Sequence, residues 1–183
     1  MLYAIQNIDE SLMLFIQENL RFTPLNHVMR LFTYAGEMGS AWIVLALFFI
    51  FIKKDGKTGL LMLAGLAVGY VINDVVLKNL VARPRPFLDM PELVALVSPP
   101  SSYSFPSGHA ASGFCSAYIL AKSGGKRRGL FYLLAVVIAL SRPYVGVHYV
   151  SDVLAGALLG TLIAAALVFI AGKLRRLNDK QTD

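Results

Sequence analysis

Cysteine and charged residues are scarce in this chain of 183 residues. Cys115 is the single cysteine, so the chain forms no disulfide within itself and no cysteine-rich metal site. Charged residues make up 15% of the sequence, whereas about 25% is usual for a soluble domain. Hydrophobic residues account for 56%, and the mean hydropathy is +0.62. These values exclude intrinsic disorder, disfavour a soluble globule and indicate an integral membrane protein.

The apolar residues gather in runs that predict an all-α integral membrane bundle of five transmembrane helices. A helix that crosses the hydrocarbon core of roughly 30 Å needs about 20 residues. The third and fourth runs are shorter than this, so we expect polar residues at their outer ends to lie below the membrane surface. The five runs cover residues 41–52, 58–77, 110–121, 129–140 and 153–171.

The first 36 residues are expected to form an amphipathic, interfacial segment. Apolar side chains share one helical face over residues 5–20, and polar ones occupy the other. Asp9 would lie near the middle of a membrane span here, at a cost of roughly 2.5–3.5 kcal/mol. We therefore predict an amphipathic helix on the membrane surface, then a second short helix from Pro24 through Tyr34. A sixth transmembrane helix is the alternative.

The net charge of +6 is explained by the membrane rather than by nucleic acid. Eleven of the 17 basic residues fall within 53–57, 122–128 and 173–180, each just beyond an apolar run. Lys and Arg are retained on the cytoplasmic side during insertion. This pattern predicts a transmembrane domain over 37–175, a cytoplasmic tail over 176–183, and no nucleic-acid partner.

Three polar motifs then lie together on the extracytoplasmic side, and we number them in chain order. The first motif runs from Lys78 to Pro86, the second from Ser104 to His109, and the third from Ser141 to Asp152. Charged residues at membrane depth are costly and are functional candidates by default. The basic clusters alone predict the topology, so the convergence of the motifs on one face is a separate observation.

The residue types in these motifs suit a phosphate group. Lys78, Arg85 and Arg142 supply positive charge, and the planar guanidinium makes bidentate contacts with phosphate oxygens. Ser107 and Gly108 open a predicted helix, where free N–H groups and the helix dipole favour an anion. Asp152 is the single carboxylate that we expect near these cations, so we predict no metal ion and no cofactor.

Two histidines complete the predicted chemistry. His148 and Asp152 are four residues apart and would share one face of a helix. A carboxylate that accepts one imidazole N–H fixes the tautomer and leaves the other nitrogen free to attack. His109 is then available as a general acid for the leaving oxygen. These residues together predict phosphoryl transfer.

The three motifs match a known signature: Lys78-x6-Arg85-Pro86, Pro106-Ser107-Gly108-His109 and Ser141-Arg142-x5-His148-x3-Asp152. Over roughly residues 60–160 the sequence resembles the type 2 phosphatidic acid phosphatase superfamily. The resemblance implies a helical bundle and metal-independent dephosphorylation through a phosphohistidine intermediate. It implies His148 as nucleophile, Asp152 as the residue that orients it, and His109 as acid. It also implies a phosphate-binding set of Lys78, Arg85, Ser107, Gly108 and Arg142.

Several substrates are compatible with this resemblance. Small bacterial membrane members are similar to undecaprenyl diphosphate phosphatases, so we expect conversion of undecaprenyl diphosphate to undecaprenyl phosphate outside the cytoplasm, at the cell membrane. Phosphatidylglycerophosphate, phosphatidate and lipid A phosphatases carry the same signature and are alternatives. Vanadium-dependent haloperoxidases share the anion pocket but are large and soluble. A non-catalytic lipid-phosphate binder is the alternative of a different class. The oligomeric state stays open.

Several residues outside the signature have two interpretations. Asp74 precedes Lys78 by four residues, so the two could pair on one helical face or simply be buried at a helix contact. Arg83 has either a functional role or the role of an interfacial charge. The glycine pairs 65/69 and 156/160 predict close helix packing. An interfacial aromatic belt is expected from Trp42, Tyr103, Tyr144 and Tyr149.

Overall fold

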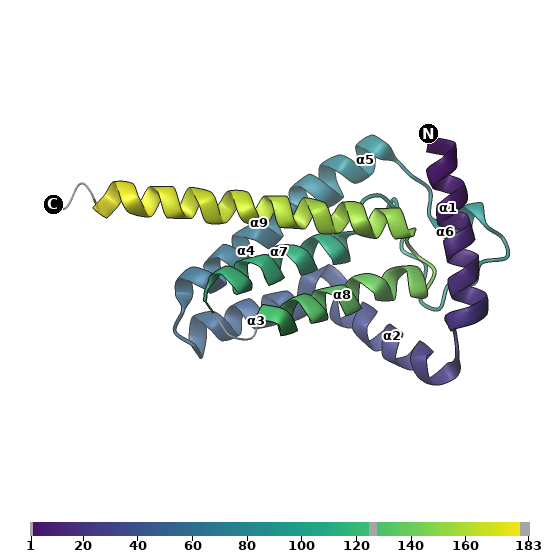
Figure 1. Cartoon of the computed structure of the whole chain (residues 1–183), viewed down its shortest axis with the longest axis horizontal. Helices are drawn as coiled ribbons and strands as arrows, with labels where there is room; N and C mark the ends of the chain where they lie inside the picture. Colours follow the sequence, from purple (N-terminus) through teal and green to yellow (C-terminus); the bar gives the residue numbers. More distant parts are fainter. Residues whose placement is uncertain (1, 125–127, 180–183) are drawn as a thin grey trace.

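The computed structural model describes residues 2–124 and 128–179, and in these ranges it contains helices and no strands (Figure 1). The first half of the chain forms α1 (Leu2–Phe15), η1 (Ile16–Leu20), α2 (Thr23–Ala35), η2 (Glu37–Gly39), α3 (Ser40–Phe51) and α4 (Gly56–Tyr70). The π-helical segment η3 (Val71–Leu77) continues α4 into α5 (Lys78–Val81), and α6 (Pro86–Asp89) follows. The second half forms α7 (Gly108–Lys122), α8 (Arg128–Tyr144) and α9 (Val150–Asp179).

The five predicted apolar runs fall in α3, in α4 with η3, and in α7, α8 and α9. Among the described residues, two segments are long and apolar enough to cross a membrane, Gly56–Asp89 and Val150–Asn178. The pair α2 and α3, bent by 51°, would supply a third span if it is counted as one. The number of transmembrane helices therefore stays a prediction, as does the interfacial position of α1 and α2.

The bend between α2 and α3 has a local cause in the backbone. Met38 and Gly39 both adopt positive φ angles, of 48° and 72°. These left-handed conformations lie in η2, after the end of α2, and turn the chain before α3 begins at Ser40. The next helix, α4, begins where the Asp55 carboxylate accepts a hydrogen bond from the Thr58 amide, 3.1 Å away. This bond lowers the pKa of Asp55 below its ordinary value.

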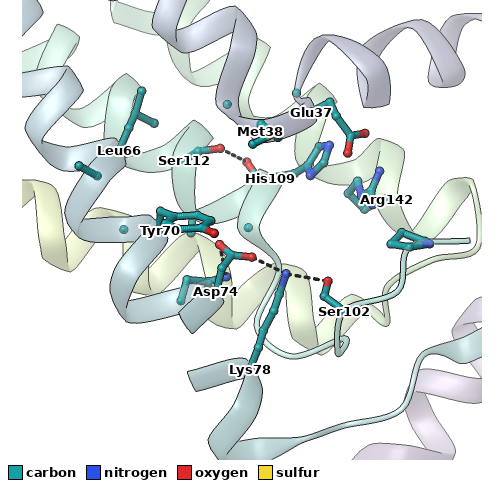
Figure 2. Close-up of a pocket in the computed structure, with 18 of the residues that line it drawn as sticks. Glu37, Met38, Leu66, Tyr70, Asp74, Lys78, Ser102, His109, Ser112 and Arg142 are labelled. Atoms are coloured by element: carbon teal, nitrogen blue, oxygen red, sulfur yellow. Dashed lines mark hydrogen bonds and ion pairs between the residues drawn. The ribbon is translucent and has the colours of Figure 1, made fainter. Parts of the chain in front are cut away.

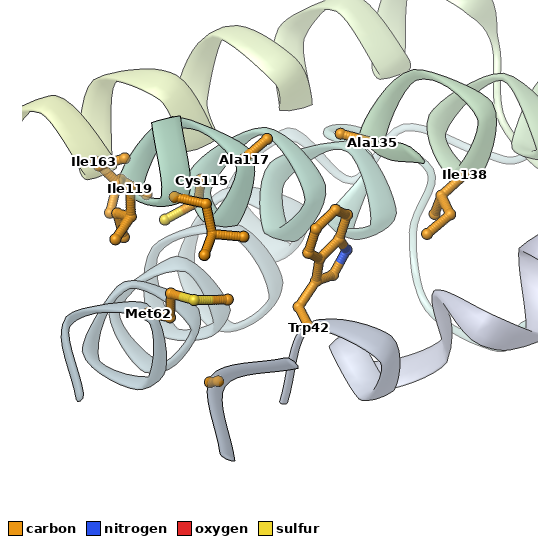
Figure 3. Packing of buried hydrophobic residues seen from close by; sticks show 11 residues of the cluster. Trp42, Met62, Cys115, Ala117, Ile119, Ala135, Ile138 and Ile163 are labelled. Atoms are coloured by element: carbon orange, nitrogen blue, oxygen red, sulfur yellow. The ribbon is translucent and has the colours of Figure 1, made fainter. Parts of the chain in front are cut away.

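Helix α7 lies at the centre of the bundle and packs against α4, α8 and α9. Figure 3 shows the core that these helices share with α3, in which Met62 faces Cys115 and Ile119 and Trp42 belongs to the same cluster. Trp42 is fully buried there, and Tyr149 and Tyr144 are also buried. The predicted aromatic belt is therefore wrong for these three residues, whose rings fill the interior. Tyr103 is exposed.

Glycine at two positions of α9 lets its backbone touch α7. A Cβ atom on Gly156 would lie 2.3 Å from the Ser107 carbonyl oxygen, and one on Gly160 would lie 2.0 Å from that of Ala111. Gly65 of α4 has the same role, because its Cβ would lie 2.7 Å from the Cys115 sulfur. Gly69 has open space around it, so the predicted packing role does not hold for that residue.

The two ends of the bundle differ in charge and in the motifs that they carry. The turn from α3 to α4, the end of α7 and the end of α9 lie toward the left of Figure 1, and they carry the described residues of the three basic clusters except Arg128, which begins α8. Lys126, Arg127, Lys180 and the rest of the tail over 180–183 lie outside the described residues. Helices α1 and α6 lie at the opposite end, together with the loops that carry the predicted motifs. Which membrane face each end occupies stays a prediction.

Candidate active site

The three motifs meet around a cavity of about 530 Å³. Lys78 begins α5, His109 lies in the first turn of α7, and Arg142 lies in the last turn of α8 (Figure 2). Arg85, Gly108 and His148 also line this cavity. Ser107 and Asp152 are fully buried and adjoin the lining residues Gly108 and His148. The fold thus brings all eight predicted site residues into one region.

His148 is buried and makes contacts through both ring nitrogens. Its Nδ1 lies 3.5 Å from Asp152 Oδ2, and its Nε2 lies 3.3 Å from Arg85 Nη1. The prediction that both residues lie on one helix is wrong, because α9 begins only at Val150. Asp152 instead reaches back from the first turn of α9 to the loop that holds His148. The pairing is the same, but it depends on loop geometry.

Asp152 is held by hydrogen bonds on both carboxylate oxygens. Oδ2 accepts from the Ser104 hydroxyl at 2.5 Å and from the Tyr149 amide at 2.9 Å. Oδ1 accepts from Arg83 Nη1 at 2.6 Å. Ser104 also lies 3.5 Å from His148 Nδ1, which places its hydroxyl between the carboxylate and the imidazole. Ser104 was not among the predicted site residues, although it opens the second motif.

Lys78, Arg85 and Arg142 lie buried at the cavity, each less than 10% exposed. Arg85 is fixed by backbone carbonyls, from its Nε to Ser102 at 2.6 Å and from its Nη1 to Val147 at 2.7 Å. Arg142 donates from Nη1 to the Thr33 hydroxyl at 2.5 Å. Within the described ranges, neither arginine has a carboxylate at ion-pair distance. Their charge is therefore available to an anion in the cavity.

Three buried polar atoms at this cavity have no partner among residues 2–124 and 128–179. One is an acceptor, the amide oxygen Oδ1 of Asn73, and two belong to donor groups, the hydroxyl of Ser107 and Nε of Arg142. Buried polar groups are nearly always hydrogen-bonded in folded proteins. A phosphate oxygen is an acceptor that both groups can donate to, because a hydroxyl carries an O–H and a guanidinium carries N–H groups.

Lys78 is paired with Asp74, as one of the two interpretations of that residue predicted. Its Nζ lies 2.5 Å from Asp74 Oδ1 and 3.4 Å from the Ser102 hydroxyl. Figure 2 shows the ammonium group between these two partners. Asp74 also lies close to the start of α7, since a Cβ on Gly108 would be 3.2 Å from its Oδ2. Glycine at 108 therefore leaves room for both the carboxylate and an approaching anion.

The cavity contains more negative charge than the motifs indicated. Glu37 and Asp74 both line it, so the prediction that Asp152 is the single nearby carboxylate is wrong. Glu37 lies outside the three motifs, in the turn after α2, and sequence spacing does not reveal that this turn reaches the site. No group of three histidine, cysteine or acidic side chains that could hold a metal ion occurs in the part of the chain that the structure describes.

His109 lines the cavity from the first turn of α7. Its Nε2 lies 2.9 Å from the Thr33 carbonyl oxygen, which can only accept, so Nε2 carries the proton of this hydrogen bond. A Cβ on Gly36 would lie 2.6 Å from the imidazole ring, so the backbone of the turn after α2 packs directly on it. Figure 2 shows Glu37 and Arg142 next to the ring.

Arg83, which lies outside the signature, is also part of this region. It pairs with Asp152 and with Asp9 of α1, at 2.6 and 2.8 Å. Arg83 is therefore half-buried and paired with two carboxylates, and its position at the membrane interface stays a prediction. Asp9 is only 2% exposed, so its carboxylate is covered by protein. Spacing carries no signal for this pair, because 74 residues separate its members.

Comparison with known proteins gives consistent matches. The family model described as the PAP2 superfamily matches residues 58–176. Decaprenylphosphoryl-5-phosphoribose phosphatase of Mycobacterium tuberculosis is 36% identical over 149 residues, which cover 81% of each chain. Undecaprenyl-diphosphatase of Sulfolobus acidocaldarius is 33% identical over 124 residues, which cover 67% of this chain and 60% of the relative.

A solved structure resembles the whole arrangement of helices. The transmembrane PAP2-type phosphatidylglycerolphosphate phosphatase of Bacillus subtilis superimposes with a TM-score of 0.73 at 33% sequence identity. The match covers 93% of this chain and 87% of that one. Coverage this high extends the likeness beyond the helices that carry the three motifs.

Proposed function

The chain belongs to the PAP2 superfamily, and from this we propose that it is a metal-independent lipid phosphatase that acts through a phosphohistidine intermediate. One observation carries the proposal. His148 places Nε2 in a cavity next to Arg85, while its Nδ1 faces a buried carboxylate. A carboxylate in this position favours the tautomer with the proton on Nδ1 and leaves Nε2 as the nucleophile.

The reaction proceeds in two steps. His148 Nε2 attacks phosphorus, and the bond from phosphorus to the leaving oxygen breaks while His109 gives that oxygen a proton. Water then attacks phosphorus, His109 takes a proton from the water, and the N–P bond breaks to release inorganic phosphate. His109 Nε2 keeps its proton in the hydrogen bond to the Thr33 carbonyl, so the proton that moves is on Nδ1. His109 therefore enters the reaction as the imidazolium, gives the Nδ1 proton to the leaving oxygen and recovers it from the water.

The cations stabilise the charge that develops on the transferred group. Arg85, Arg142 and Lys78 surround the cavity, and their fixed positions require no reorganisation during the reaction. The unpartnered hydroxyl of Ser107 and the N-terminus of α7 donate to the same oxygens. Three buried cations supply what a metal ion provides in other phosphatases, which supports a reaction that needs no added metal.

A lipid substrate is supported by the other part of the same cavity. Beyond the cations its wall is apolar and includes Ile43, Leu63 and Leu66, from α3 and α4. A headgroup can therefore lie among the cations while the chain attached to it leaves sideways toward the bilayer. Burial of a lipid tail contributes about 0.8 kcal/mol per CH₂ group, so a soluble phosphate ester should be the poorer substrate.

We propose undecaprenyl diphosphate as the substrate and the extracytoplasmic face of the cell membrane as the site of the reaction. The names of the relatives refer to undecaprenyl diphosphate, to decaprenylphosphoryl-5-phosphoribose and to phosphatidylglycerolphosphate. The last two make a lipid phosphate monoester the second candidate, with phosphatidylglycerophosphate as the test compound. The basic residues at the opposite end of the bundle support the sidedness.

The test measures phosphate release by purified protein in detergent micelles that contain EDTA. Undecaprenyl diphosphate, phosphatidylglycerophosphate and phosphatidate are compared at equal mole fraction in the micelle. The His148→Ala variant should release no phosphate from any of them. His27→Ala is the matched control, because His27 is exposed and bonds to the Thr23 carbonyl of its own helix. Wild-type protein that binds these lipids without releasing phosphate would establish the non-catalytic alternative.

A further inference from the structure

Arg83 is half-buried and lies at the centre of a cluster that joins α1 to the candidate active site. Its Nη1 donates to Asp152 Oδ1 and to the Ser151 hydroxyl, and its Nη2 donates to Gln6 and to Asp9 Oδ2 at 2.7 and 2.8 Å. The guanidinium also lies 3.9 Å from the centre of the Tyr149 ring. A residue that makes this many charged contacts in one geometry holds its partners rigidly.

The contact with Asp152 fixes the rotation of that carboxylate. Arg83 takes Oδ1, while Oδ2 faces His148, Ser104 and the Tyr149 amide. The ion pair with Arg83 opposes rotation about the last side-chain bond, so the plane of the carboxylate is fixed relative to the imidazole. The orientation of the oxygen that faces His148 is therefore held by a residue that does not touch the imidazole.

Asp9 has an electrostatic role in the same cluster. Arg83 alone would neutralise Asp152 and would weaken the attraction of that carboxylate for the positive charge that His148 gains during attack. The second carboxylate restores one net negative charge to the set of Asp9, Arg83 and Asp152. Both acidic residues are almost fully buried, so solvent screens this effect little. The backbone amide and the hydroxyl of Ser151 in α9 also donate to the Asp9 carboxylate.

We propose that Arg83 and Asp9 are positioning residues for the phosphatase reaction, so that the N-terminal helix α1 completes the active site. This inference rests on the proposed function. Arg83 holds Asp152 in the one orientation that aligns His148, and Asp9 balances the charge of Arg83. The competing interpretation is a purely structural role, in which the cluster only attaches α1 to the bundle.

Arg21 provides the matched control for a purely structural role. It also joins the N-terminal segment to the rest of the chain, through the Tyr144 and Val94 carbonyls at 2.9 and 2.6 Å, but it does not touch Asp152. Glu18→Gln, an exposed substitution in η1, controls for the loss of one negative charge near α1. The test compares Asp9→Asn, Arg83→Gln and their double variant with these two controls, all as full-length protein.

The first readout is steady-state kinetics below the unfolding midpoint of every variant. Because a misplacement of about 1 Å can cost 100-fold in rate, we expect Arg83→Gln to lower kcat by roughly that factor. Asp9→Asn should lower kcat about tenfold, with KM unchanged within twofold. The double variant should be no slower than Arg83→Gln, because Asp9 acts through Arg83. Arg21→Gln should lower the midpoint and leave kcat unchanged.

The second readout does not depend on turnover. The chain contains three histidines, so the ¹⁵N spectrum of the histidine side chains can be assigned with single substitutions. Asp9→Asn and Arg83→Gln should change the ¹⁵N shifts of His148 and leave those of His27 in place, whereas Arg21→Gln should change neither. Wild-type protein that releases no phosphate would overturn the proposed function. Wild-type kcat and unchanged His148 shifts in both cluster variants would overturn this inference alone.

Discussion

The two helices that carry much of the site touch each other, backbone to backbone, at Gly156. Helix α7 supplies His109 and begins just after Ser107, and α9 supplies Asp152, whose carbonyl accepts a hydrogen bond from the Ser107 amide at 3.0 Å. A Cβ at position 156 would lie 2.3 Å from the Ser107 carbonyl oxygen. Since ordinary contact begins near 3.4 Å, Gly156→Ala requires α9 to move by about 1 Å relative to the start of α7.

This displacement should change both stability and rate. Forced overpacking typically costs about 1–3 kcal/mol, and backbone atoms yield least, so the upper half of that range applies. Alanine recovers about 1 kcal/mol of helix propensity over glycine. We therefore expect a net loss of roughly 1–2 kcal/mol in the free energy of unfolding. A shift of about 1 Å between Asp152 and the phosphate-binding residues should lower kcat by about 100-fold.

The assay pairs Gly156→Ala with Gly172→Ala on the same helix. Gly172 has open space where its Cβ would be placed, so that variant should gain up to about 1 kcal/mol and keep wild-type kcat. Chemical unfolding in mixed micelles gives the stability difference, and phosphate release gives the rate. A Gly156→Ala protein with wild-type stability and kcat would refute the claim that backbone contact between α7 and α9 sets the geometry of the site.

Three further predictions concern the cations, the Asp74 pair and the sidedness of the site. Phosphate release should survive EDTA, because buried arginines stand at the cavity; activity that requires added Mg²⁺ would contradict the mechanism. Asp74→Asn should lower KM, because no carboxylate then competes with phosphate for Lys78. It should also lower the free energy of unfolding by about 1 kcal/mol, since the ion pair that it removes is partly exposed. A raised KM would show that Asp74 positions Lys78 instead. In a Cys115→Ala background, a cysteine at Ser101 should react with an impermeant thiol reagent on intact cells and one at Ser123 should not; the reverse pattern would place the site in the cytoplasm.

The sequence predicted both the positions of the helices and the residues at the cavity, but from different signals. Apolar runs located α3, α4, α7, α8 and α9 because burial in lipid requires continuous hydrophobic sequence. The motifs located the site because their residue types suit one ligand. The predicted pairing of His148 with Asp152 is correct, but the predicted reason, a shared helical face, is wrong. His148 lies in the loop before α9 and contacts Asp152 from there.

The partners of buried charges could not be predicted from spacing. Periodicity separates an apolar from a polar face of α1, but it does not show what covers Asp9. The covering residue is Arg83, which comes from a loop after α5. The same limit applies to Trp42, which is of a residue type common at membrane interfaces and lies in the core. In each case the deciding contact joins segments that the sequence keeps far apart.

The turn at η2 between α2 and α3 has an evolutionary consequence. Its two glycines are constrained, Gly36 by the imidazole of His109 and Gly39 by its positive φ angle. Between them, Glu37 and Met38 line the cavity, are exposed and lie between the two α-helices. Mutations at these two positions would reshape this part of the cavity wall while the phosphate-binding residues on α5, α7 and α8 keep their places. Descendants of one ancestral enzyme could therefore exchange one lipid headgroup for another through two residues, with the reaction chemistry inherited intact.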